Sequence, residues 1–233
     1  MKTIGILGGM SWESTQSYYR ALNLGVKEAL GGLHSARVVL VSVDFAEIET
    51  LQQQGDWQAA GDSLASAARQ VERAGADFLL IATNTMHKVA AQIEAAIDIP
   101  LLHIADATAE RLLADGITKV GLLGTAFTME QAFYKDRLSE EFGIEVLVPD
   151  AEQRKLVHRV IYEELCQGVV EEASRKAYLE VIDSLHGHGA QAVILGCTEI
   201  ALLVEQGDTS VPLYDTTAIH CAAAVASALE IDP

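Results

Sequence analysis

The chain has 233 residues, of which 50% are hydrophobic and 21% charged, with 18 glycines, 4 prolines and 3 cysteines. This composition excludes a disordered, collagen-like or disulfide-stapled protein and indicates a globular chain. Its 33 acidic residues against 16 lysines and arginines give a formal charge of −17. Nucleic acid and anionic lipid are therefore poor candidate partners, because both are polyanions.

The apolar segments and the cysteines narrow the class further. The longest apolar runs, such as 78–82, fall far short of the about 18 residues of a membrane helix, and residues 2–8 are too short for a signal-peptide core. We therefore expect a cytoplasmic protein that binds no membrane. The three cysteines, Cys166, Cys197 and Cys221, form no C-x-x-C pair, so any thiol chemistry would use a free thiol and no metal is expected.

Short aliphatic segments alternate with longer helical segments along the chain. In chain order we expect a strand, a helix, a strand, a helix and then five further strands separated by helices, at 3–7, 13–30, 37–43, 57–74, 78–82, 100–104, 120–123, 145–148 and 193–195. This order is typical of an α/β fold with parallel strands covered by helices.

The sequence also resembles itself. Three segments of the second half match three of the first, in the same order and at a nearly constant separation, namely 120–125 with 4–9, 189–198 with 75–84, and 211–213 with 99–101. We therefore expect two pseudo-symmetric lobes, each a short parallel sheet flanked by helices. The first would comprise 1–98 plus 210–233 and the second 99–209.

Thr83 and Cys197 occupy corresponding positions in this repeat, each where an apolar strand gives way to polar residues. Ligands of parallel α/β sheets bind outside the carboxyl ends of the strands. The sequence therefore predicts that these two side chains face one small ligand from opposite sides, in a cleft between the lobes.

Five segments carry a resemblance to a known family: GGMSWEST at 8–15, SVDF at 42–45, TNTMHK at 83–88, GTAFTM at 124–129 and GCTEI at 196–200. Together they make the chain similar, over essentially its whole length, to the cofactor-independent aspartate/glutamate racemase superfamily, nearer its aspartate and broad-specificity amino-acid racemase branch. Glu199 resembles the aspartate-type pattern. The resemblance implies a homodimer in which one thiol removes the α-proton of an amino acid and another returns a proton from the opposite face, without pyridoxal phosphate.

The chain departs from that pattern at one position, because Thr83 occupies the place of the first cysteine. A threonine hydroxyl can donate or relay a proton but is a poor base, whereas a cysteine with a pKa near 8.5 supplies some thiolate at neutral pH. We expect Cys197 to be the base for the L enantiomer and Thr83 the proton donor on the other face. Initial assays would favour L to D conversion, although kcat/KM must be equal in both directions for free enantiomers.

Substrate-binding roles fall on Met10, Gln52, Asn84, Thr85 and Thr198. The backbone N–H groups around Met10, at a strand-to-helix junction, could hold a carboxylate, or the glycines before it could simply form a tight turn. Asn84, Thr85 and Thr198 could bind the α-carboxylate and α-amino group, or cap the following helix. Gln52 matches a substrate-contacting position of the branch, or is a surface glutamine.

The preferred function is an isomerase, an amino-acid racemase without cofactor that acts on aspartate or glutamate. Two alternatives remain open. A single thiol suffices for decarboxylation of a substituted malonate, in which Cys197 would protonate a carbanion. The chain could also be a non-catalytic protein that binds dicarboxylates or amino acids.

Overall fold

The computed structural model describes residues 1–230. The chain divides into two compact units, one formed by Met1–Ile104 and the segment from His220 onward, the other by Ala105–Ile219. These boundaries lie later along the chain than the expected 98/99 and 209/210. Each unit contains one parallel sheet covered by helices, which confirms the predicted fold class.

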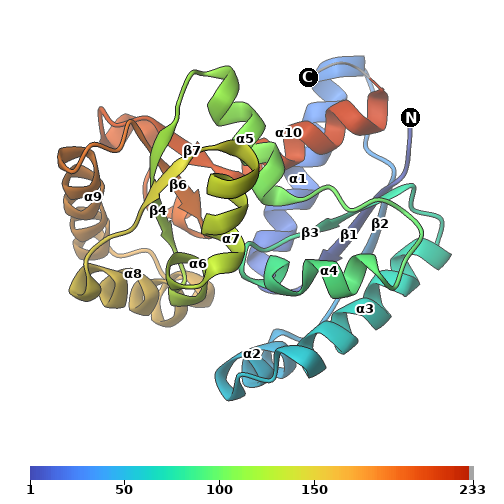
Figure 1. Cartoon of the computed structure of the whole chain (residues 1–233). Helices are drawn as coiled ribbons and strands as arrows, with labels where there is room; N and C mark the ends of the chain where they lie inside the picture. Colours follow the sequence, from blue (N-terminus) through green and yellow to red (C-terminus); the bar gives the residue numbers. More distant parts are fainter. Residues whose placement is uncertain (231–233) are drawn as a thin grey trace. The chain divides into compact units, whose positions relative to one another are not determined.

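The first unit is built on a three-stranded parallel sheet with the order β2-β1-β3. Its strands are β1 (Ile4–Gly8), β2 (Val38–Ser42) and β3 (Phe78–Ile81). Its helices are α1 (Trp12–Leu30), α2 (Phe45–Gln54), α3 (Trp57–Arg73), η1 (Thr85–Val89) and α4 (Ala90–Glu94), together with the greater part of α10 (Thr216–Leu229). Figure 1 shows α1 and α10 on one side of this sheet and α3 and α4 on the other.

The two faces of this sheet carry separate apolar clusters. Ile4 and Ile6 point toward α1 and α10, where they pack with Tyr18 and Val225. The alternate strand residue, Leu7, belongs to the cluster on the opposite face, formed mainly with α3 and α4. Because helices cover both faces of the sheet, a ligand can reach it only at the strand ends. Polar residues follow the carboxyl ends of these strands.

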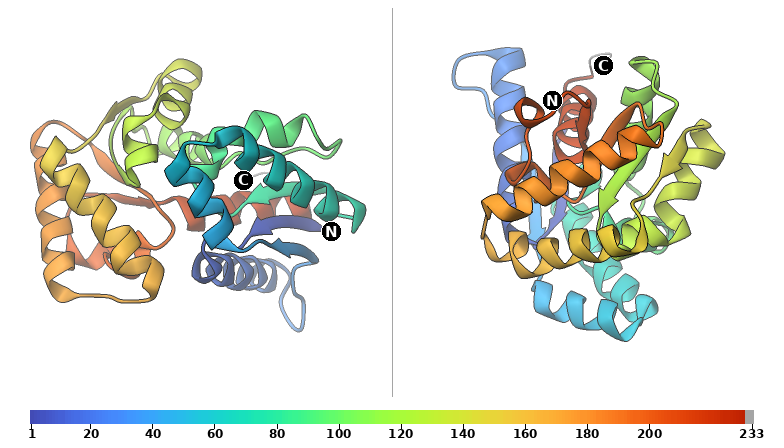
Figure 2. Two further views of the ribbon diagram at one scale, coloured as in Figure 1. Left: turned by 90° about the horizontal axis from the view of Figure 1, so that it is seen from below. Right: turned by 90° about the vertical axis from the view of Figure 1, so that its left-hand side faces the viewer.

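The second unit contains a four-stranded parallel sheet with the order β5-β4-β6-β7. Its strands are β4 (Lys119–Gly124), β5 (Glu145–Leu147), β6 (Ala192–Gly196) and β7 (Leu213–Asp215). Its main helices are α5 (Ile104–Ala114), α6 (Ala126–Glu130), α7 (Ala132–Asp136), α8 (Ala151–Glu163) and α9 (Glu172–Gly187), with short turns η2 (Arg137–Glu141), η3 (Leu165–Gln167), η4 (Ile200–Leu202) and η5 (Gln206–Asp208). Helices α8 and α9 cover one face of this sheet, as Figure 2 also shows.

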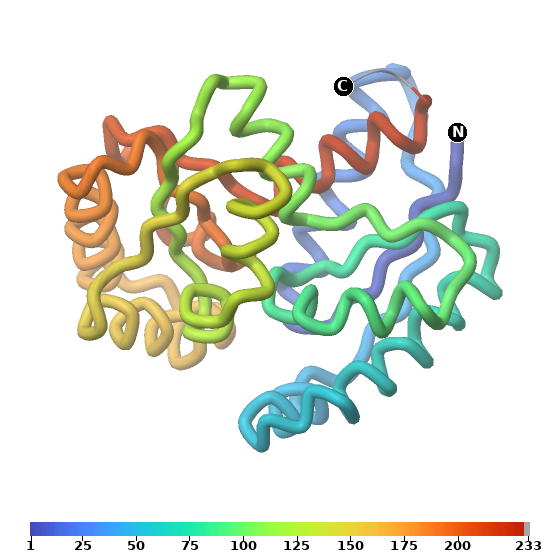
Figure 3. The backbone as a smooth tube through the Cα atoms, viewed as in Figure 1, coloured from blue at the N-terminus to red at the C-terminus, as the bar shows by residue number. Residues whose placement is uncertain are grey.

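The internal repeat of the sequence is matched by the pairing within each unit. β1 pairs with β2 and β3, and β4 pairs with β5 and β6, in the same relative order. The segment after β3 and the segment after β6 also pair with these strands in the same way. The N–H of Leu79 in β3 donates to Pro100 O at 2.9 Å, and the N–H of Val193 in β6 donates to Pro212 O at 2.8 Å. Figure 3 traces the backbone of both units through these crossovers. The two halves therefore share one folding pattern.

Most of the expected strands form within one or two residues of their expected bounds, but the strand at 100–104 does not. Only Leu101 makes a bridge, to Leu79, and α5 already begins at Ile104. A short apolar run cannot distinguish the end of a strand from the start of a buried helix. Across residues 1–230, none of the helices combines the length and apolarity that a bilayer crossing requires.

Candidate active site

In the first unit, the turn after β1 lies at the carboxyl end of the sheet. Gly9 has a φ of +94°, and a Cβ at this position would lie 2.2 Å from the carbonyl oxygen of Val43. Only glycine fits this conformation and this close backbone approach. Its N–H donates to Thr15 Oγ1 at 2.8 Å, so this amide is used inside the turn. Met10 lies next to it, 4% exposed and within the apolar cluster on the α3 side.

The expected residues Thr83, Asn84 and Thr85 begin two residues after the end of β3. Thr83 is partly exposed, whereas Asn84 and Thr85 are buried. Asn84 occupies the N-cap position of η1, yet its side chain makes no capping hydrogen bond. The interpretation of Asn84 as an ordinary helix cap is therefore wrong.

Gln52 is not a surface glutamine. It lies in α2 with 4% of its surface exposed, while its neighbours Gln53 and Gln54 are exposed. Its Nε2 donates to Met86 Sδ at 2.9 Å, and Met86 is the residue after Thr85. Gln52 therefore packs against the turn that carries the polar residues after β3, in the same unit as Thr83 and Met10.

The last two residues of the TNTMHK segment, His87 and Lys88, make contacts within the first unit. The ammonium group of Lys88 lies 3.8 Å from the ring centroid of Trp57, a cation–π contact, and burial lowers the pKa of Lys88. The imidazole Nδ1 of His87 lies 2.8 Å from the carbonyl oxygen of Thr83.

In the second unit, Cys197 and Thr198 follow directly after β6, at the position that corresponds to Thr83 and Asn84. The Cys197 thiol donates to Glu199 Oε2 at 3.0 Å, and Thr198 Oγ1 donates to the same oxygen at 2.7 Å. Glu199 is 3% exposed and Cys197 9% exposed. A buried carboxylate thus accepts hydrogen bonds from both side chains that precede it.

The surroundings of Cys197 determine its protonation state. Burial raises the pKa of the Cys197 thiol well above its usual value, and the negative charge of Glu199 raises it further. At neutral pH the group is therefore a thiol that points its proton at a carboxylate. Such a pair can move a proton between sulfur and oxygen without help from solvent.

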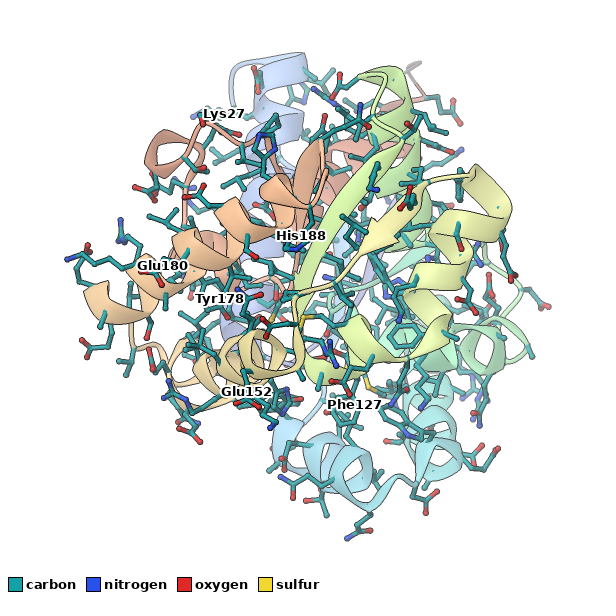
Figure 4. The ribbon with its side chains drawn as sticks, turned by 60° about the vertical axis from the view of Figure 1, so that its left-hand side comes forward. Lys27, Phe127, Glu152, Tyr178, Glu180 and His188 are labelled. Carbon is teal, nitrogen blue, oxygen red and sulfur yellow. The ribbon has the colours of Figure 1, made fainter. Side chains whose placement is uncertain are left out.

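Other hydrogen bonds join the elements of the second unit to one another. Thr125 caps α6 by accepting from the N–H of Thr128, and the N–H of Ala126 donates to His158 Nδ1 at 3.1 Å. Burial lowers the pKa of His158, consistent with a neutral acceptor. Tyr178, labelled in Figure 4, donates from α9 to Val157 O of α8 at 2.9 Å.

The other two cysteines have packing roles. Cys221 is 2% exposed in the α1–α10 cluster, and Cys166 packs at the margin of the α8–α9 cluster. None of the three cysteines, all of which the structure describes, forms a disulfide. Within residues 1–230, histidine, cysteine and acidic side chains form no group of three that could hold a metal ion.

Each expected site residue thus lies at a strand end or packs against one. Met10, Gln52, Thr83, Asn84 and Thr85 gather in the first unit, and Cys197 and Thr198 in the second. Sequence reasoning did not foresee the contact between Glu199 and Cys197. The available signal was a carboxylate two residues after a cysteine at the end of an apolar strand.

Comparison with known proteins places this chain in a family of enzymes. A match to the family model for Asp/Glu/hydantoin racemases covers residues 7–224. A candidate Asp/Glu racemase of Yersinia pestis, known from its crystal structure, is 58% identical, with a TM-score of 0.92 over 98% of this chain and 100% of that one. An aspartate racemase homologue from Pyrococcus horikoshii OT3 is 36% identical, with a TM-score of 0.85 over 98% of this chain and 100% of that one.

A curated relative is more distant. The broad specificity amino-acid racemase RacX of Bacillus subtilis (strain 168) is 25% identical over 156 residues, which are 67% of this chain and 66% of that relative, slightly less than two thirds of its length. The family match and the two structures confirm the predicted resemblance and the class of enzyme, an isomerase. The chain belongs to the Asp/Glu/hydantoin racemase family.

Proposed function

We propose that this protein racemises aspartate or glutamate without a cofactor, with Cys197 as the base for the L enantiomer. The observation that carries the proposal is the thiol of Cys197 at the carboxyl end of β6, 3.0 Å from a buried carboxylate oxygen of Glu199. A thiol in this position can be deprotonated locally when substrate enters, because a proton acceptor is already in hydrogen-bond contact.

The first half-reaction is then a pair of proton transfers. The thiol proton passes to Glu199, and the resulting thiolate removes the α-proton of the L substrate, which leaves a carbanion and a reprotonated thiol. The raised pKa of Cys197 makes the thiolate a stronger base once it forms, since basicity follows the pKa of the conjugate acid.

The second half-reaction uses Thr83 on the opposite face of the α-carbon. Its hydroxyl donates a proton to the carbanion and takes one from water, so that no free alkoxide has to persist. Glu199 then releases its proton to solvent, which balances the proton taken from water. Thr83 is suited to this relay because it is partly exposed at the end of β3, while its neighbours Asn84 and Thr85 are buried.

Substrate binding is assigned to neutral donors. Asn84, Thr85, Thr198 and the backbone of Met10 would hold the α-carboxylate and α-amino group, with Gln52 as a donor for the side-chain carboxylate. The Pyrococcus relative is described as an aspartate racemase homologue and the Bacillus relative as a broad specificity amino-acid racemase. Aspartate and glutamate are therefore the first substrates to test, with neutral amino acids beside them.

The test follows both the optical rotation and the isotope content of the substrate. L-aspartate, L-glutamate and neutral L-amino acids are incubated in heavy water with the wild type and with Cys197→Ser, and are followed by circular dichroism and proton NMR. The wild type should exchange the α-hydrogen of an L substrate faster than it inverts the carbon. Cys197→Ser should lose both activities by about 100-fold or more, the usual worth of a general base.

Cys221→Ser is the matched control, because Cys221 is also buried and outside any disulfide but packs against α1. This variant should keep both activities. Equal exchange and inversion rates from both enantiomers would contradict a one-thiol mechanism. Carbon dioxide release from substituted malonates without any racemisation would replace the proposal by the decarboxylase. Size-exclusion chromatography and cell fractionation test the expected homodimer and cytoplasmic location.

A further inference from the structure

Three buried histidines gather around one segment of the first unit. His87 comes from η1, His103 from the segment that follows Pro100, and His220 from α10, and their exposed fractions are 4%, 7% and 0%. The ring centroids of His87 and His103 lie 4.4 Å apart, and those of His87 and His220 lie 6.2 Å apart. The reaction proposed above uses none of them.

His87 contacts the backbone on both sides of its ring. Its Nδ1 lies 2.8 Å from the carbonyl oxygen of Thr83, and the N–H of Ile104 lies 3.3 Å from its Nε2. A carbonyl oxygen can only accept and an amide N–H can only donate, so Nδ1 carries the proton and Nε2 is the acceptor. Both contacts together fix a neutral ring in one tautomer.

The contact with Thr83 replaces a backbone hydrogen bond. The N–H of His87 donates to Asn84 O at 3.1 Å, as in a 3₁₀ turn. In an α-helix the same N–H would donate to Thr83 O, four residues back. The imidazole of His87 takes over that bond and holds the carbonyl of Thr83 from the side.

The other end of the His87 ring rests on a segment that is itself fixed. His220 Nε2 donates to Leu102 O at 2.8 Å, and the hydroxyl of Tyr18 donates to His220 Nδ1 at 2.8 Å. Residues 102–104 are thus tied to α10 and, through Tyr18, to α1. His87 therefore links the turn at Thr83 to a segment that is itself hydrogen-bonded to α10.

We propose that His87 is a positioning residue for Thr83. By holding the carbonyl oxygen of Thr83, His87 sets the direction of the Thr83 hydroxyl. This inference rests on the proposed function, in which Thr83 delivers the second proton. A displacement of about 1 Å in a group that acts on a reacting atom can cost about 100-fold in rate. Because the side chain and the carbonyl of Thr83 share one Cα, a tilt of this peptide would also turn the hydroxyl.

The experiment separates the two half-reactions on one substrate. His87→Ala is incubated with L-aspartate or L-glutamate in heavy water, and the deuterated L product and the D product are measured by NMR and chiral chromatography. Inversion should fall by about 10- to 100-fold, while exchange of the α-hydrogen, which depends on Cys197, should change by less than about threefold. Retained exchange also shows that the variant is folded.

Two further variants sharpen the result. His87→Asn places an amide nitrogen where Nδ1 lies and should restore much of the inversion, whereas His87→Gln places its amide at the Nε2 position and should not. The matched control is His186→Ala, because His186 Nδ1 also bonds a carbonyl oxygen four residues away, Ala190 O at 2.8 Å, but at the turn between α9 and β6. Its exchange and inversion should equal those of the wild type.

The inference is overturned if exchange and inversion fall by the same factor in His87→Ala, or if His87→Asn and His87→Gln behave alike. Absence of inversion in the wild type would instead overturn the proposed function, because that outcome does not depend on His87.

Discussion

At the scale of single residues, Glu199 has two opposing effects on Cys197. Its negative charge raises the pKa of the thiol, after the larger effect of burial, and so disfavours the thiolate at rest. Its oxygen, 3.0 Å from Sγ, is also the acceptor that the thiol proton needs during the reaction. A neutral amide in the same place would remove the repulsion and the proton acceptor together.

Glu199→Gln should therefore make the thiol more reactive and the enzyme less active. The rate of Cys197 alkylation by iodoacetamide should rise at neutral pH and its pH midpoint should move down, because the thiolate is no longer repelled. The rate of α-hydrogen exchange should fall by about 100-fold or more, the worth of a general base. If alkylation and exchange rise together, Glu199 only suppresses the thiolate and carries no proton.

At the scale of elements, the sequence predicts more of the fold than of the site. The segments around β1, β3 and β6 are recognisable because alternating or continuous apolar residues are bounded by glycine and polar residues. The error at 100–104 arises because pairing stops at Leu101, where α5 is about to begin. The Cys197–Glu199 and His87–Thr83 contacts depend on side-chain rotamers and on residues from other elements, which a linear pattern does not contain.

The turn between β1 and α1 offers a prediction at this scale. Gly9→Ala would place a Cβ 2.2 Å from Val43 O and 2.6 Å from Val43 N in a residue with a φ of +94°. Both neighbours are backbone atoms, so the backbone just after β2 would have to shift. We expect a loss of about 2–4 kcal/mol in the free energy of unfolding, measured in urea.

The matched control for this turn is Gly55→Ala at the end of α2. Gly55 has a φ of +71° with no atom within 4 Å of the added Cβ, so only the conformational cost of about 1 kcal/mol applies. Equal losses in the two variants would mean that strain in φ, and not the approach of Val43, makes glycine necessary at position 9.

At the scale of the whole molecule, the internal repeat was recognisable in the sequence because each half keeps the same strand order. The glycines at the second position of β1 and at the third position of β4 illustrate why. A Cβ on Gly5 would lie 2.4 Å from Val71 of α3, and one on Gly121 would lie 2.8 Å from Leu185 of α9. In the first unit α3, which precedes β3, packs directly on the central strand β1, and in the second unit α9, which precedes β6, packs directly on β4. Both central strands therefore require glycine at the point of contact.

The stability of the molecule should depend on pH through His220. Burial lowers the pKa of His220 to about 4, against about 6.5 in an unfolded chain. Between these two pH values the unfolded chain binds one proton more than the folded chain, so the free energy of unfolding rises with pH. The contribution of His220 to stability is therefore lost as the pH falls from about 6.5 toward about 4. From pH 7 to pH 5 this one group should cost the wild type about 2 kcal/mol.

The comparison that isolates this effect is His220→Gln, whose amide nitrogen can still donate to Leu102 O but cannot take up a proton. Urea denaturation at pH 7 and pH 5 should show that the wild type loses about 2 kcal/mol more than the variant over this interval. Acidic side chains titrate in both proteins and cancel in the difference. His188→Gln serves as the control, because His188 is exposed, and it should lose as much as the wild type. If His220→Gln also lost that amount, the buried imidazole would not be the source of acid sensitivity, and the protonation of other groups would have to account for it.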